Sequence, residues 1–93
     1  MIVAKVVGNI WATRKEDTLQ GMKLMIVQVI DPISQDSGRS FVAVDQVGAG
    51  IGETVIVSTG SSARLAKLGR HSPIDAIIVG IVDQMDVPPA RDE

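Results

Sequence analysis

Apolar residues recur along this chain in short runs rich in valine and isoleucine, and polar or glycine-containing breaks separate the runs. Side chains branched at Cβ favour extended backbone, so each run is predicted to form a β-strand. The five predicted strands cover residues 2–13, 24–31, 40–44, 54–59 and 76–85. Alternation within the first run predicts that one face of that strand carries Ile2, Ala4, Val6, Gly8, Ile10 and Ala12.

Two of these strands carry more apolar side chains than a single core requires. On the second face of the first strand, Val7 and Trp11 lie among polar residues, and a subunit contact would explain that mixture. The last strand is apolar on both faces between residues 77 and 82. A strand of that kind in a small antiparallel domain requires a second covering surface.

One helix is predicted, over residues 61–68, because serines at its start can cap its first N–H groups and Gly69 can end it. Five strands and one short helix favour an all-β fold, a small OB-like β-barrel, since closure removes the exposed strand edges. Residues 1–86 form the single predicted domain. Residues 87–93 contain two prolines, which cannot extend a sheet, and are predicted to be a flexible tail.

Composition favours association with further copies of the chain. Of its 93 residues, 45% are hydrophobic and 22% are charged, yet a domain of this size has only a marginal core. A homo-oligomer, which buries the excess, is therefore predicted. The net charge of -2 and the small aromatic content, Trp11 and Phe41, argue against binding of nucleic acid. A cytosolic protein without membrane contact is expected, because no apolar run approaches the ~20 residues of a membrane span and no secretory leader is recognisable.

Small residues gather in two clusters, which are Gly48, Ala49 and Gly50, and Gly60, Ser61 and Ser62. Neither cluster fits a nucleotide site, since the spacing of a dinucleotide fingerprint is broken and the lysine of a P-loop is absent. Residues without bulky side chains let backbones approach closely, and a cyclic axis repeats each loop once per subunit. The two clusters are therefore candidates for contacts around such an axis.

Charged and titratable residues suggest structural roles. Copies of Arg64 brought together at an axis would repel one another, so Arg64 is predicted to pair with a carboxylate or to face an anion. Its possible partners are Asp45, Glu53 and Asp75. The single histidine, His71, cannot form a metal site alone, and no acid–base pair is evident. No enzymatic activity, metal or cofactor is predicted.

Several segments together resemble one family of small proteins. They read MIVAKVVG at 1–8, ATRK at 12–15, LQGMKL at 19–24, DP at 31–32, VDQVGAGIGE at 44–53, GSSAR at 60–64 and PIDAIIVGIVD at 73–83. In this order they resemble the EutN/CcmL family, whose members form the pentameric vertices of bacterial microcompartment shells.

The resemblance implies a structural shell protein that assembles as a cyclic pentamer, with hexamer-forming shell proteins as its partners inside the bacterial cytoplasm. The two small-residue clusters and Arg64 would then line the central opening or the subunit contacts around it. Two alternatives stay open at this point. One is a ring that binds small anions at its opening, where Ser61 and Ser62 begin the predicted helix. The other is an enzyme whose site has no recognisable motif.

Overall fold

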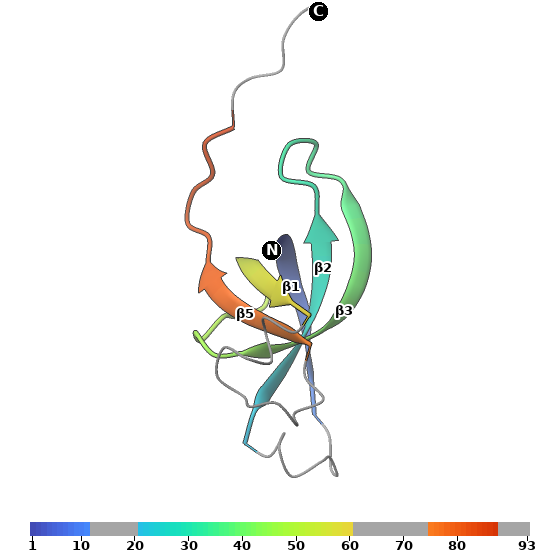
Figure 1. Ribbon diagram of the computed structural model, residues 1–93, viewed down its shortest axis with the longest axis vertical. Helices are drawn as coiled ribbons and strands as arrows, with labels where there is room; N and C mark the ends of the chain where they lie inside the picture. The colour runs from blue at the N-terminus through green and yellow to red at the C-terminus, as the bar shows by residue number, and fades with distance from the viewer. Residues whose placement is uncertain (12–20, 61–74, 88–93) are drawn as a thin grey trace, which may run out of the picture.

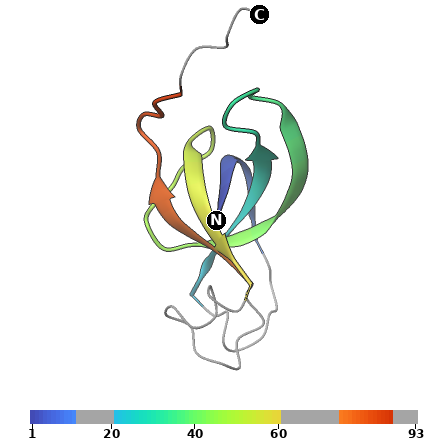
Figure 2. The same ribbon diagram turned by 45° about the horizontal axis from the view of Figure 1, so that its top comes forward.

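Five strands form the part of the protein that the computed structural model describes, which is residues 1–11, 21–60 and 75–87. They are β1 (Ile2–Ile10), β2 (Lys23–Ile30), β3 (Ser37–Asp45), β4 (Thr54–Thr59) and β5 (Ala76–Ile81). The strands close into a barrel in the order β1-β2-β3-β5-β4 (Figures 1 and 2). All neighbours are antiparallel except β3 and β5, which run parallel. The predicted all-β, five-stranded barrel is confirmed, whereas the helix predicted over residues 61–68 lies outside the described residues.

The strand boundaries follow from where each pairing partner ends. The strand predicted over 54–59 is confirmed as β4. β1 ends at Ile10, and residues 12 and 13 of the predicted first strand lie outside the described residues. β5 ends at Ile81 and not at residue 85, because β4 offers no residue beyond Thr54 to extend the ladder. β3 begins three residues earlier than predicted, at Ser37, where a register shift lets it pair with the end of β2.

The main core fills the barrel with small and medium apolar side chains. Its buried members are Ala4, Val6, Met25, Val27, Ala43, Ala49, Val55, Val57, Ala76 and Ile78. The predicted inward face of β1 is confirmed at Ala4 and Val6, both fully buried. It is wrong at Ile10, because a bulge shifts the register between Val6 and Gly8. Beyond the bulge, Ile10 lies opposite Leu24, which packs on a second, separate cluster.

The last strand has two apolar faces, as predicted. Ile77 and Ile78 are neighbours in sequence and point to opposite sides of β5, yet they are only 1% and 0% exposed. Ile78 belongs to the main core and Ile77 to the second cluster, where it packs with Val44. β5 is therefore covered on both faces at this level of the barrel.

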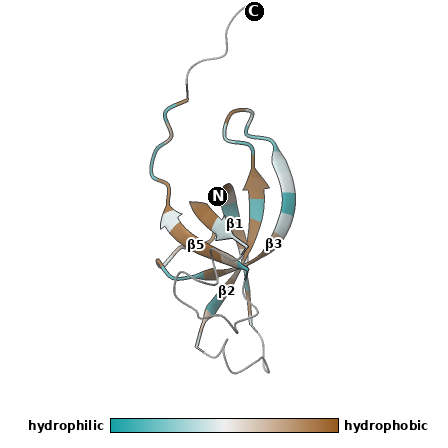
Figure 3. Ribbon diagram, in the orientation of Figure 1, coloured by the Kyte–Doolittle hydropathy of each residue, from teal (hydrophilic) through white to brown (hydrophobic). Residues whose placement is uncertain are grey.

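The turn between β2 and β3 is held by one carboxylate. Oδ1 of Asp31 accepts hydrogen bonds from the backbone N–H groups of Ile33 at 2.8 Å and Ser34 at 3.0 Å. The bond from Ser34, followed by that from Ile33, lowers the pKa of the Asp31 carboxyl, because both stabilise its charged form. The hairpin end of β3 is exposed, and Figure 3 shows it pale to teal beside the brown barrel strands. Within the described ranges, no helix is long and apolar enough to span a membrane.

Candidate functional site

The loop between β3 and β4, residues 46–53, contains the first cluster of small residues and begins at a buried carboxylate. Oδ1 of Asp45 accepts hydrogen bonds from the backbone N–H groups of Val47 at 3.0 Å and Gly48 at 3.2 Å. The Asp45 side chain is only 1% exposed. A carboxylate that accepts the N–H groups two and three residues later fixes a turn, because it replaces a backbone acceptor. The buried carboxylate at the end of β3 thus fixes the start of the loop.

Lys23 of β2 joins the same carboxylate to the middle of the loop. Its Nζ lies 3.4 Å from Oδ2 of Asp45 and donates a hydrogen bond of 2.9 Å to the carbonyl oxygen of Ala49. The Lys23 side chain is 52% exposed, so solvent screens the ion pair and leaves it less than about 1 kcal/mol of stabilisation. Its main effect is positional, because it ties the loop to the adjacent strand.

The second half of the loop is attached to β1. Oε1 of Glu53 accepts a hydrogen bond of 2.6 Å from the N–H of Gly50. The N–H of Gly52 donates to the carbonyl of Val6 at 2.8 Å, and the N–H of Val6 donates to the carbonyl of Glu53 at 2.9 Å. Gly48 has a φ of +82°, a conformation that residues with a Cβ rarely adopt. The loop is consequently a fixed surface feature, anchored at its start, middle and end.

Residues 47–51 of this loop differ in what they present to a neighbour. Gly48 is exposed and Gly50 half-buried. Ala49 has no exposed surface at all and belongs to the main core, so its side chain cannot line an opening or touch another subunit. Sequence reasoning placed it with its glycine neighbours, since a loop has no periodicity that separates inward from outward residues. It also missed Val47 and Ile51, which are 42% and 61% exposed beside the glycines.

The second cluster is described only at its first residue. Gly60 directly follows β4, is exposed and has a φ of +74°. Its N–H donates a hydrogen bond of 2.7 Å to the carbonyl of Asp75, which precedes β5. This bond joins the two ends that flank residues 61–74. Ser61, Ser62 and Arg64 lie outside the described residues.

The carboxylates named as possible partners of Arg64 differ in how far they are already engaged. Asp45 is bonded to Lys23 and to two backbone N–H groups, and Glu53 accepts the N–H of Gly50. Asp75 is exposed, and its residue borders a surface hollow of about 340 Å³ together with Gly60. A pairing of Arg64 with any of them stays a prediction. Among the described residues, no group of three or more acidic, histidine or cysteine side chains is placed to hold a metal ion.

Comparison with known proteins identifies relatives along almost the entire chain. The sequence matches a family model described as "Ethanolamine utilisation protein EutN/carboxysome" over residues 1–83. It is 46% identical over 86 residues to the bacterial microcompartment shell vertex protein GrpN of Rhodospirillum rubrum, which covers 92% of this chain and 97% of the relative. It is 41% identical over 87 residues to the carboxysome shell vertex protein CcmL of Synechococcus elongatus, with 94% of this chain and 88% of the relative covered.

Solved structures agree with these sequence relatives. The pentameric microcompartment shell protein GrpN from Rhodospirillum rubrum superposes with a TM-score of 0.82 at 44% identity, and 96% of this chain and 100% of that chain are covered. CcmL of Gloeobacter violaceus superposes with a TM-score of 0.85 at 35% identity, covering 94% of this chain and 90% of that chain. Fold, length and sequence therefore agree over the whole barrel.

Proposed function

The chain belongs to the EutN/CcmL family, and from this membership we propose that it is a shell vertex protein of a bacterial microcompartment. The observation that carries the proposal is its likeness, at 44% identity and a TM-score of 0.82, to the whole of a pentameric shell protein. The protein forms a pentamer, its role is structural rather than enzymatic, and it works in the shell of a compartment inside the bacterial cytoplasm. The relatives give no support to the alternative of an anion-binding ring without a shell role.

The mechanism is geometric. A closed shell tiled mainly by six-fold units requires five-fold units at its corners, because flat six-fold tiling cannot curve in two directions. A closed ring of five identical subunits supplies such a unit, since each subunit presents one surface to the next until the rotation closes. No cofactor takes part in this role.

Two stretches are proposed to meet neighbouring subunits or to surround the central opening: the loop 46–53 and the stretch that starts at Gly60. The exposed backbone of Gly48 allows close approach, while the anchors at Asp45 and Lys23 hold the loop in one conformation before assembly. A loop that is already fixed loses little conformational entropy on association. Within this proposal Ala49 has an anchoring role, because it is buried in its own protomer. Ser61, Ser62 and Arg64 are included on the sequence alone.

The outer rim of the ring is proposed to contact hexamer-forming shell proteins. The turn at residues 31–36 supports this, because all of it is exposed and it projects at one end of the barrel (Figure 1). The Asp31 hydrogen bonds give that turn a defined shape, which a repeating shell contact requires.

Two measurements test the proposed function. Sedimentation equilibrium at low micromolar concentration should give a mass of five chains, each of 9.8 kDa. Co-expression with a hexamer-forming shell protein should yield closed particles that contain the chain, whereas expression of the hexamer protein alone should yield open sheets or tubes. A protein that stays monomeric at high concentration would contradict the pentamer. A pentamer that is absent from the particles would contradict the vertex role.

A further inference from the structure

Beyond β5 the chain leaves the barrel as an extended arm, residues 82–87. The N–H of Val82 donates to the carbonyl of Thr54 at 2.8 Å, and this is the last backbone hydrogen bond to the barrel in the described part of the chain. Figure 1 shows the arm running away from the barrel along the longest axis of the molecule, on the same end as the turn between β2 and β3. The arm therefore presents backbone N–H and carbonyl groups that have no partner strand among the described residues.

Residues 84–87 of the arm have one polar and one apolar side. Nε2 of Gln84 donates a hydrogen bond of 3.0 Å to Oδ1 of Asp86, which places these two side chains on the same side. In extended backbone, alternate residues share a face, so Met85 and Val87 lie together on the opposite side. They are 37% and 40% exposed. An isolated strand with an exposed apolar face gains stability only by packing against another surface.

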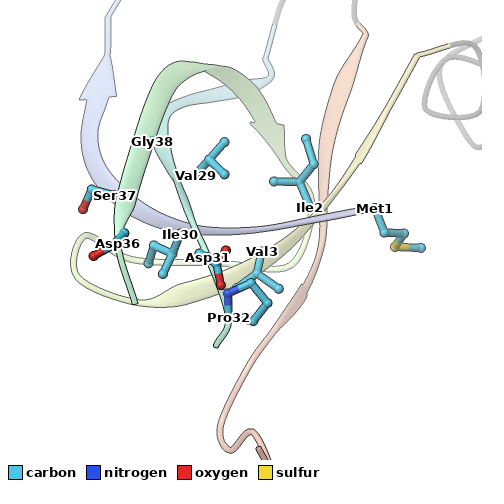
Figure 4. Close-up of a pocket in the computed structure, with 10 residues that line it drawn as sticks. All are labelled: Met1, Ile2, Val3, Val29, Ile30, Asp31, Pro32, Asp36, Ser37 and Gly38. Atoms are coloured by element: carbon cyan, nitrogen blue, oxygen red, sulfur yellow. The ribbon is translucent and has the colours of Figure 1, made fainter. Parts of the chain in front are cut away.

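A matching hollow lies at the mouth of the barrel, between the N-terminus and the turn after β2. Figure 4 shows its lining, which consists of Met1, Ile2, Val3, Val29, Ile30, Asp31, Pro32, Asp36, Ser37 and Gly38. Its volume is about 530 Å³, within the range of pockets that hold small ligands or side-chain clusters. Apolar side chains such as Ile2 and Val29 line it, and polar groups of the turn form its rim (Figure 4). No residue of the arm lines the hollow of its own protomer.

Resting on the proposed pentamer, we propose that the arm of each subunit inserts Met85 and Val87 into the mouth hollow of the next subunit. Arm and hollow are different surfaces of one chain, so their contact is of the head-to-tail kind. Repeated around a ring, such a contact fills every hollow and leaves no arm free. The hollow is thus occupied by residues 82–87 of a second copy. The unpaired backbone groups of that arm can also form hydrogen bonds with the subunit that receives it.

The charged residues on the arm and around the hollow are mostly of the same sign. The arm carries Asp83 and Asp86, while the rim of the hollow carries Asp31 and Asp36 with only the Met1 amine as an opposite charge. Like charges across the contact oppose association, so the attraction comes from apolar burial. Added salt screens such repulsion at the surface, and the ring is expected to become tighter as ionic strength rises.

Cross-linking tests the contact directly, because the chain has no cysteine of its own. A chain carrying both Val87→Cys and Ile30→Cys, treated with a short bismaleimide, should give a ladder of covalent species ending at the five-chain product. A mixture of the two single variants should give a covalent dimer. Either single variant alone, as the matched control, should give none.

The outcomes separate this inference from the proposed function. Internally linked single chains without a ladder would mean that the arm folds onto its own barrel, and would overturn the inference. A pentamer by mass that yields no cross-link would overturn it as well, while leaving the proposed function intact. Absence of a pentamer in the unmodified protein would instead contradict the proposed function.

A second experiment measures the energetic role of the arm. The double variant Met85→Ser with Val87→Ser should raise the apparent dissociation constant of the ring by about tenfold or more, because two apolar side chains lose their burial. The matched control, Gln84→Ser with Asp86→Ser, alters the polar face and should leave the constant unchanged or lower it. Circular dichroism at a concentration where the ring forms checks that both variants keep the barrel. Equal effects of the two variants would overturn the inference.

Discussion

At the scale of single residues, Gly48 is a position where loop conformation depends on the lack of a side chain. Its φ is +82°, and no neighbouring atom lies within 4 Å of the position that a Cβ would occupy. Glycine is therefore required by the backbone conformation and not by a lack of space for a side chain. Gly48→Ala should lower the free energy of unfolding by about 1–2 kcal/mol, the cost of an L-residue in the left-handed region. Urea unfolding at fixed protein concentration measures the change.

Gly48→Asn provides the control for this reason. Asparagine enters the left-handed region more readily than alanine, so Gly48→Asn should destabilise less even though its side chain is larger. If Asn proved as destabilising as Ala, or more so, backbone strain would not be the cause.

The burial and the bonding partners of individual side chains were the features that the sequence predicted least well. The small-residue pattern singled out residues 48–50, yet it could not show that Ala49 faces the core. Nor could it show that Asp45, suggested as a partner of Arg64, is held by Lys23 and by backbone N–H groups. Both facts depend on how the strands and the loop meet in three dimensions, and a linear pattern carries no such information.

At the scale of elements, β5 closes the barrel by pairing with β3 on one side and β4 on the other. Ile78 of this strand is fully buried, while the next residue, Val79, is 41% exposed. Ile78→Ala should therefore cost about 2–5 kcal/mol of unfolding free energy, because it leaves a cavity in the main core. Val79→Ala is the matched control and should cost less than about 1 kcal/mol in the isolated protomer. Urea unfolding under dissociating conditions compares the two, and comparable losses would mean that β5 is oriented differently.

Prediction from sequence worked best where turn residues bounded a strand on both sides. β4 lies between the loop 46–53 and Gly60, and its limits were predicted correctly. The face assignment of β1 held only as far as the bulge after Val6, because an inserted residue inverts the alternation that follows. The end of β5 was misplaced because apolar character continues into the arm, although the pairing partner does not. A strand ends where its neighbour ends, and the neighbour is known only from the fold.

At the scale of the whole molecule, composition predicted association, in agreement with the pentameric relatives, but could not give the number of subunits. Apolar content exceeds what a 93-residue barrel can bury, and ten large hydrophobic residues among those described are exposed. Closure at five depends on the tilt between neighbouring subunits, a property of the interface geometry. The pentamer is instead supported by the pentameric relatives.

Stability and assembly should therefore be linked in this protein. The buried core consists of alanine, valine, isoleucine and methionine, and such a small core leaves a lone protomer marginally stable. When five chains unfold and separate together, each tenfold rise in concentration adds about 1 kcal/mol per protomer. For a domain of this size, the midpoint of thermal unfolding should rise by about 4–8 °C per decade of concentration, measured by circular dichroism. Met85→Ser with Val87→Ser should show the same slope only at higher concentrations, where its weakened ring still forms. A midpoint independent of concentration in the unmodified protein would mean that the barrel is stable without its neighbours, and that burial between subunits is not what stabilises the fold.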